Sequence, residues 1–317
     1  MTAALPTPAQ PLKIGTRGSP LALAQAHETR DRLAAAFDLP PEAFEVVVIV
    51  TTGDRVQDRA LKEIGGKGLF TREIEADMLS GKIDIAVHSM KDMPVLQPEG
   101  LVLDCYLPRE DVRDAFVSLG GGALDALEEG AVVGTSSLRR RAQVLYKRPD
   151  LKVVEFRGNV QTRLRKLADG VAQATFLAMA GLRRLNRTGD VPHMPIPDDV
   201  MLPAVAQGAI GIERRADDSR VAEMLEAIHD LRTGQQLAAE RAFLAALDGS
   251  CETPIGGLAV LDGGSLHLRG EILRSDGSEC LADATSGAIE DGAEMGRSIA
   301  AGLLARAGEG FFDWHQA

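Results

Sequence analysis

The sequence predicts an α/β protein with two βα lobes followed by a small α+β domain. Near residue 12, and again near residue 131, a short apolar strand leads into a Gly-Thr pair, a serine and a helix, as expected of two similar lobes. Beyond residue 255 the pattern changes to short alternating strands with Asp-Gly turns, which is typical of antiparallel hairpins. The 317 residues, of which 45% are hydrophobic, suffice for two or three separate cores.

The composition argues against several classes of protein. A net charge of −11 and an aromatic content of 4% do not favour nonspecific binding to nucleic acid or to a membrane surface. No apolar run is long enough to span a bilayer, and the first eleven residues lack the basic start and apolar core of a signal peptide. Three cysteines and six histidines show neither a disulfide framework nor metal-ligand spacing, so we expect a cytoplasmic protein without a metal.

The first lobe opens with a strand over Leu12–Gly15 and a helix over about Pro20–Phe37. Ser19 is a favourable N-cap, and Pro20 suits the first helical position. A strand, a tight turn and a helix N-terminus together form an anion site, because free backbone N–H groups point out of the helix end. Arg17 lies in this turn, where it serves either that site or merely the surface.

Strands are also expected at residues 44–51, 83–88 and 101–106, with a helix at 69–79. The loop from Gly53 to Gly68 is polar, and its glycines indicate mobility or close approach to a ligand. It is not a Walker A loop, because Leu61 stands at the position of the first glycine and Gly68 replaces the required Ser or Thr.

The strand that begins at Ile83 ends in a group of polar residues. Ser89, Lys91 and Asp92 follow it directly, and Pro94 prevents easy continuation. Ligands of open α/β sheets bind beyond the carboxyl ends of the strands, so an ammonium and a carboxylate lie side by side where a ligand is expected. The alternative is a solvated turn with a weak surface ion pair.

The second lobe is expected to have strands at residues 131–133, 151–156 and 174–179, with helices after each. In the helix over about 138–147, Leu138, Ala142 and Leu145 are the expected buried stripe, which leaves the neighbouring arginines on its flanks. Arginines in a first helical turn oppose the helix dipole unless an anion binds there. The alternative is a solvated charged face.

Arginines recur just beyond the strand ends of both lobes. A planar guanidinium holds a carboxylate through paired hydrogen bonds. In a chain with a net charge of −11, such a concentration predicts a specific polyanion site, and discrete carboxylates or phosphates suit the spacing better than a duplex backbone. The arginines are Arg17, Arg139, Arg140, Arg157, Arg163 and Arg184.

The segment 203–212 is expected to be a strand that returns to the first lobe, which gives a hinged two-lobed binding architecture with a ligand in its cleft. A helix at 234–247, strands at 258–261, 265–273 and 279–284, and a helix at about 293–307 complete the chain. Cys251 lies in a Gly/Ser-rich loop, whereas Cys105 and Cys280 lie in strand-like stretches. A loop cysteine is either a nucleophile, if its thiolate is favoured, or an incidental free thiol.

The sequence resembles the porphobilinogen deaminase family from about Lys13 through the closing helix. The resemblance rests on long segments, namely 16–23 (TRGSPLAL), 65–70 (GGKGLF), 87–92 (VHSMKD), 134–140 (GTSSLRR), 157–160 (RGNV) and 202–208 (LPAVAQG). It implies two periplasmic-binding-protein-like βα lobes, at 12–107 plus 203–226 and at 112–201. It also implies a C-terminal cofactor-attachment domain at 230–317, with a three-stranded antiparallel sheet.

The resemblance implies that four porphobilinogen molecules condense head to tail with loss of ammonia, and that water releases linear hydroxymethylbilane. The chain grows on a covalent dipyrromethane cofactor, joined through a thioether to Cys251. We expect a monomer that binds this small-molecule substrate, with neither a nucleic-acid nor a membrane partner.

The resemblance also assigns roles to individual residues. Asp92 is the catalytic carboxylate, and Lys67 is a loop residue that covers the cleft. Glu63 and Gln173 depart from residues that occur in relatives. The cofactor is held by Ser19, Lys91, Ser137, Arg139, Arg140, Arg157, Arg163 and Arg184, and the substrate by Arg17, Ser19, Arg157, Arg163 and Arg184.

Two alternative hypotheses, from other classes of protein, remain. A non-catalytic two-lobed anion-binding protein would be expected to carry a signal peptide and no special cysteine. An arginine-dependent nucleic-acid regulator would be expected to have a net basic charge or a helix-turn-helix. The sequence shows neither set of features.

Overall fold

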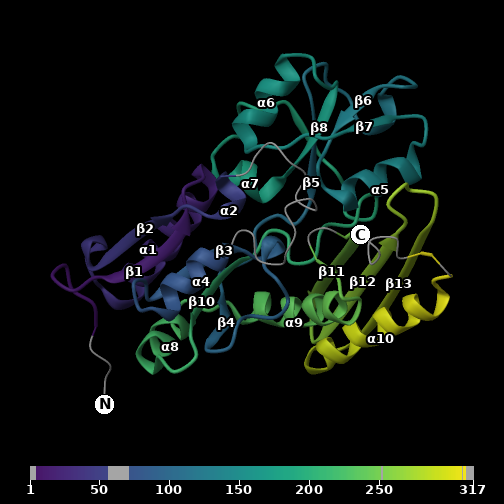
Figure 1. Ribbon diagram of the computed structural model, residues 1–317. Coiled ribbons are helices and arrows are strands. Elements are labelled where there is room, and N and C mark those ends of the chain that lie inside the picture. The colour runs from purple at the N-terminus through teal and green to yellow at the C-terminus, as the bar shows by residue number, and fades with distance from the viewer. Residues whose placement is uncertain (1–4, 56–70, 251–252, 309, 312–317) are drawn as a thin grey trace. The chain divides into compact units, whose positions relative to one another are not determined.

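The computed structural model describes residues 5–55, 71–250, 253–308 and 310–311 (Figure 1). The chain divides into two compact units. Unit 1 comprises Met1–Glu110 and Ala209–Gly234, and unit 2 comprises Asp111–Gly208 and Gln235–Ala317.

Unit 1 is built on a five-stranded sheet with the order β2-β1-β3-β10-β4. β1 runs parallel to β2 and β3, whereas β10 runs antiparallel to β3 and β4. The strands are β1 (Leu12–Arg17), β2 (Phe44–Ile49), β3 (Ile85–Ser89), β4 (Leu101–Tyr106) and β10 (Ile210–Arg215). The helices are α1 (Pro20–Phe37), α2 (Thr52–Arg55), α4 (Arg72–Leu79) and α8 (Ser219–Glu226).

Helices cover both faces of this sheet. Ile85 packs into a core with residues of α1 and α8, whereas its neighbour Ala86 packs into a second core with residues of α4. Adjacent residues of β3 are therefore both buried, and the strand begins at Ile85 rather than at Ile83.

Unit 2 contains a sheet with the order β7-β6-β8-β5-β9, which repeats the pattern of unit 1. β6 runs parallel to β7 and β8, and β5 runs antiparallel to β8 and β9. The strands are β5 (Asp114–Ser118), β6 (Val132–Gly134), β7 (Lys152–Val154), β8 (Ala174–Ala178) and β9 (His193–Pro195). The helices are α5 (Leu138–Lys147), α6 (Val160–Ala168) and α7 (Met179–Arg184).

Residues 255–288 form an antiparallel sheet with the order β11-β12-β13. Helix α10 packs along β12 and β13, as Figure 1 shows. The elements are α9 (Leu231–Ala246), β11 (Ile255–Asp262), β12 (Ser265–Leu273), β13 (Cys280–Ala288) and α10 (Gly292–Arg306), and short 3-10 helices occur at Pro41–Ala43, Met90–Asp92, Leu124–Ala126 and Ile289–Asp291. The α/β part of the predicted fold class is confirmed by two five-stranded α/β sheets, and the C-terminal part is confirmed by a three-stranded antiparallel sheet with a helix.

The predicted strand at 203–212 is only partly correct, because β10 begins at Ile210 and the preceding residues form a turn. Ala206 has a φ of 60°, a left-handed conformation that cannot continue a strand. Its backbone N–H donates to Glu240 Oε2 at 2.7 Å, and this buried carboxylate stabilises the turn. In the described part of the chain, no helix combines the length and apolar character that a bilayer crossing requires.

Candidate active site

Unit 1 contains a small cavity of about 90 Å³ beside the carboxyl ends of β1 and β3. Three of the predicted site residues line it, namely Arg17, Ser19 and Asp92. Lys91 is half-buried and does not line the cavity. The polar lining also includes Ser89, from the polar group expected at the end of β3, and three residues that were not predicted as site residues, namely Gln25, Thr71 and His88.

The end of β1 and the start of α1 position Arg17 and Ser19. Ser19 has an extended backbone, and its Oγ accepts a hydrogen bond from Ala22 N at 3.2 Å, so the predicted N-cap is confirmed. Pro20 occupies the first helical position, where its missing N–H costs nothing. The capped helix end fixes this wall of the cavity.

A short 3-10 turn after β3 presents Asp92. Met90 and Met93 are 1% and 5% exposed and anchor the two ends of the turn, and Met93 N donates to Met90 O at 3.2 Å. Asp92 lies between these anchors and is exposed. At the end of β3 itself, Ser89 Oγ lies within 2.9–3.0 Å of the side-chain amide atoms of the buried Gln25.

His88, two residues before this turn, forms a buried imidazole–carboxylate pair with Glu213. His88 Nε2 lies 3.2 Å from Glu213 Oε2, and the two side chains are 5% and 0% exposed. Glu75, on α4, is also buried, and burial together with the charge of Glu213 raises the pKa of its carboxyl. This group was not predicted from the sequence, because His88 occupies an alternating strand position that is typical of an exposed face.

Unit 2 gathers arginines around one fully buried carboxylate, Asp114, on β5. Arg139 Nη2 donates to its Oδ2 at 2.8 Å, and Arg140 Nη2 donates to its Oδ1 at 2.7 Å. Arg140 Nε and Gln207 Nε2 also donate to Oδ1, at 3.2 and 3.0 Å. Burial alone would raise the pKa of Asp114, but the two guanidinium charges and these hydrogen bonds hold it well below its ordinary value.

The expected buried stripe of α5 is therefore wrong in part. Ala142 is buried as expected, but Leu138 and Leu145 are only half-buried. Arg139 and Arg140, expected on the flanks, are 3% and 5% exposed. Their burial is possible because a neighbouring strand supplies Asp114, the anion that a first helical turn with two arginines requires.

The arginine cluster extends from α5 to α6 through a shared carbonyl. Arg140 Nη1 and Arg163 Nη1 both donate to Phe176 O, at 3.1 and 3.3 Å. The N-cap Ser137 accepts a hydrogen bond from Arg140 N at 3.4 Å. The structure thus brings together Ser137, Arg139, Arg140 and Arg163.

Two further predicted arginines lie in unit 2. Arg157 is half-buried just beyond β7, and Arg184 donates through Nη2 to Gly208 O at 2.9 Å. Gln173, a departure from relatives, accepts a hydrogen bond from Val132 N at 2.7 Å and so fastens the start of β6. Cys251, Lys67 and Glu63 lie outside the described residues.

The donor set of unit 2 suits an anionic group with several carboxylates. Arginines outnumber the one carboxylate at their centre, and Arg157, Arg163 and Arg184 are partly exposed. The buried Nε of Arg139 also has no hydrogen-bond partner among the described residues. Within the same described ranges, no cluster of three or more His, Cys, Asp or Glu side chains is suited to a metal.

Comparisons with known proteins point to one family. Residues 12–223 match the family model "Porphobilinogen deaminase, dipyromethane cofactor binding domain", and residues 235–305 match "Porphobilinogen deaminase, C-terminal domain". A porphobilinogen deaminase of Paracoccus denitrificans is 66% identical over 310 residues, which cover 98% of this chain and 99% of that protein. A chloroplastic porphobilinogen deaminase of Pisum sativum is 53% identical, with 95% and 83% covered.

Proposed function

The chain belongs to the porphobilinogen deaminase family, and from this premise we propose that it condenses four porphobilinogen molecules head to tail. Each condensation releases ammonia, and water finally releases linear hydroxymethylbilane, so the protein is a transferase of tetrapyrrole biosynthesis. The proposed chemistry rests on one observation. The carboxylate of Asp92 and the guanidinium of Arg17 line the same cavity. The non-catalytic anion-binding alternative is not favoured.

Asp92 performs the proton transfers of this proposal. Its acid form protonates the amine of porphobilinogen, the C–N bond breaks, and ammonia leaves. The carboxylate that remains stabilises the positive azafulvenium, because it places an opposite charge where the positive charge develops. A new C–C bond forms when an α-carbon of the terminal pyrrole attacks the methylene carbon of the azafulvenium, and Asp92 accepts the proton that the attacking pyrrole carbon then loses.

Arg17 and Ser19 orient the incoming substrate. Porphobilinogen carries an acetate and a propionate, and a guanidinium binds such groups through paired hydrogen bonds. Ser19 sits at the N-terminus of α1, where the helix dipole also favours an anion. Both residues line the same cavity as Asp92, so a bound carboxylate would place the aminomethyl group near the catalytic acid.

The matching family domain is named for a dipyromethane cofactor, and the cationic residues of unit 2 fit such a group. When bound, dipyrromethane supplies the pyrrole carbon to which the first substrate is joined. The carboxylates of this group and of the added pyrroles would be held by Ser19, Lys91, Ser137, Arg139, Arg140, Arg157, Arg163 and Arg184. We propose that Cys251 provides the thioether and that Lys67 covers the cleft.

The structure suggests two classes among these arginines. Arg157, Arg163 and Arg184 are partly exposed and are able to contact carboxylates directly. Arg139 and Arg140 are buried against Asp114. Because two guanidinium charges meet one carboxylate, they leave this arginine cluster with a net positive charge. The three-domain division, the monomeric state and the cytoplasmic location stay predictions.

Intact-mass measurement of the denatured chain tests the covalent attachment. The wild-type protein is expected to carry the mass of two linked pyrroles, and the Cys251→Ser variant to lack it. The Cys280→Ser variant is the control, because burial raises the pKa of the Cys280 thiol to about 12 and keeps it a poor nucleophile. A Cys280→Ser protein without the added mass would contradict the assignment.

If the purified wild-type protein carries no added mass, it is incubated with porphobilinogen and its intact mass is measured again. Pyrrole mass that then appears in the wild type, and not in Cys251→Ser, supports the proposal. If no pyrrole mass ever appears on Cys251, the anion-binding alternative replaces the enzyme.

A further inference from the structure

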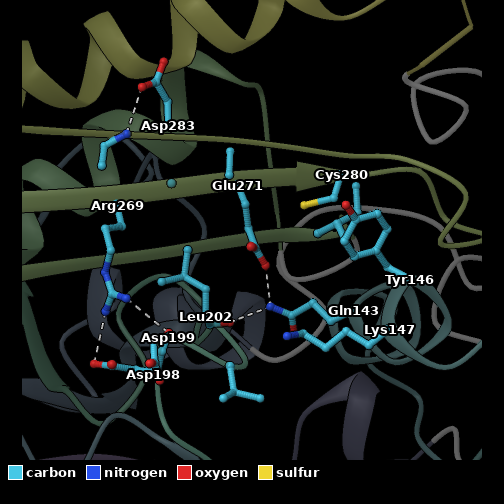
Figure 2. A pocket seen from close by; sticks show the side chains of 15 residues that line it. Gln143, Tyr146, Lys147, Asp198, Asp199, Leu202, Arg269, Glu271, Cys280 and Asp283 are labelled. Carbon is cyan, nitrogen blue, oxygen red and sulfur yellow. Dashed lines mark hydrogen bonds and ion pairs between the residues drawn. The ribbon is translucent and has the colours of Figure 1, made fainter.

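Unit 2 contains a second and larger cavity, with a volume of about 430 Å³, that none of the proposed site residues lines. It lies between the C-terminal half of α5, the segment 198–202, and residues of β12 and β13 (Figure 2). Leu202, Leu273 and Tyr146 provide apolar surface, and Glu271 projects from β12 toward Gln143. Its volume and mixed lining are typical of a small-molecule site.

The charges of the lining favour a cation. Four carboxylates and two cationic side chains line the cavity, namely Asp198, Asp199, Glu271, Asp283, Lys147 and Arg269. Arg269 is paired with Asp198 at 3.2 Å, and Asp283 lies 3.6 Å from Arg306. With these two pairs set aside, the lining leaves two carboxylates, Glu271 and Asp199, and one ammonium, Lys147, although the charges of Arg269 and Arg139 also act on Glu271.

Glu271 is the central polar group of the cavity. Its Oε1 accepts a hydrogen bond from Gln143 Nε2 at 2.5 Å, whereas its Oε2 accepts none from any residue that the structure describes. Burial raises the pKa of this carboxyl, although nearby cations and the hydrogen bond from Gln143 oppose that effect. A carboxylate that is partly removed from water, as Glu271 is, gains most from a partner that brings its own positive charge.

Cys280 lines the same cavity without adding charge. Burial raises the pKa of its thiol to about 12, so it remains protonated at neutral pH. It therefore contributes a weakly polar, nearly apolar surface next to Tyr146.

We propose that this cavity binds a small organic cation with an apolar body. An amidinium or ammonium group donates hydrogen bonds to Glu271, and the apolar body packs against Leu202, Leu273 and the ring of Tyr146. This proposal is independent of the proposed enzymatic function.

Gln143 connects this cavity with the arginine cluster. Its Nε2 donates to Glu271, and its Oε1 accepts a hydrogen bond from Arg139 Nη1 at 2.8 Å. Arg139 in turn donates to Asp114. A cation that attracts the Glu271 carboxylate therefore acts on the same amide that holds Arg139.

Calorimetric titration with benzamidine tests the proposal on the full chain. Benzamidine, a planar aromatic cation, is expected to bind at least tenfold more tightly than its neutral analogue benzamide. Glu271→Gln is expected to lower the affinity for benzamidine at least tenfold, because the amide keeps the shape and loses the charge. Glu290→Gln, an exposed position on the same unit, is the matched control and is expected to bind as the wild type does.

Two further measurements locate the site. Ala282→Trp, a change at an exposed residue of β13 that lines the cavity, is expected to block binding without removing any charge. Affinity for benzamidine is expected to rise with pH as Glu271 loses its proton. Equal affinity for benzamide and benzamidine, unchanged binding in Glu271→Gln or Ala282→Trp, or no binding at all would overturn the proposal.

Discussion

Replacing Asp92 by asparagine is expected to lower the rate of porphobilinogen consumption by a factor of about 10²–10⁴, the usual contribution of a positioned acid–base group. Asparagine keeps the size of the side chain but neither gives up nor accepts the catalytic proton. Asp92→Ala is expected to abolish elongation as well. The fold should survive in both variants, because Asp92 is exposed and the buried Met90 and Met93 hold its turn.

Steady-state rates, thermal unfolding midpoints and intact masses together check this expectation. The matched control is Glu99→Gln, another exposed carboxylate shortly after the same strand, which does not line the cavity and should leave all three quantities unchanged. Wild-type turnover in Asp92→Asn would remove Asp92 from the mechanism. A loss of rate accompanied by a lower unfolding midpoint would mean that its role is structural.

Replacing Asp114 by asparagine is expected to reduce the free energy of unfolding by about 3–5 kcal/mol, the usual cost of removing one partner from a buried ion pair. The variant leaves two guanidinium groups, which are 3% and 5% exposed, without their counterion. We also expect poor cofactor loading, because Arg139 and Arg140 would repel each other and leave their present positions. Chemical denaturation and intact mass measure the two effects.

The pH dependence of stability gives a second test of Asp114. Its pKa is lower in the folded protein than in the unfolded chain, so its contribution is fully present above the unfolded value of about 4 and is lost as the pH falls. Asp114→Asn should therefore lose less stability than the wild type between neutral pH and pH 3. The control is Asp150→Asn, which removes an ion pair with Arg148 near the surface and should change the midpoint of chemical denaturation little. If Asp114→Asn and Asp150→Asn lost the same amount of stability between neutral pH and pH 3, the role of Asp114 would be refuted.

Local signals in the sequence predicted much of the fold. The start of α1 follows from Ser19 and Pro20, which take the N-cap and the first helical position as predicted. The strand expected at 265–273 is β12 with the same ends, because Asp-Gly turns and alternating apolar residues define both of its boundaries. Such signals lie within a few residues of the feature that they determine.

Features that depend on distant residues were not predicted. No strand was expected at β5, so Asp114 was missed, although it lies 25 residues before Arg139 and is the reason that this arginine is buried. His88 and Glu213 are 125 residues apart and meet only because β10 pairs with β3. The recurrence of arginines beyond strand ends indicated a cationic site, but it did not reveal which arginines are buried.

The position of β10 has a consequence for how the chain folds during synthesis. This strand lies between β3 and β4, although all of β5–β9 precedes it in the sequence. A nascent chain that has emerged only as far as Gly208 therefore has β3 and β4 with open edges toward each other, and unpaired edges are prone to association with other chains. The first unit is complete only after the second sheet has been synthesised, so a ribosome that stalls between Pro195 and Ile210 would expose a sheet with a missing central strand.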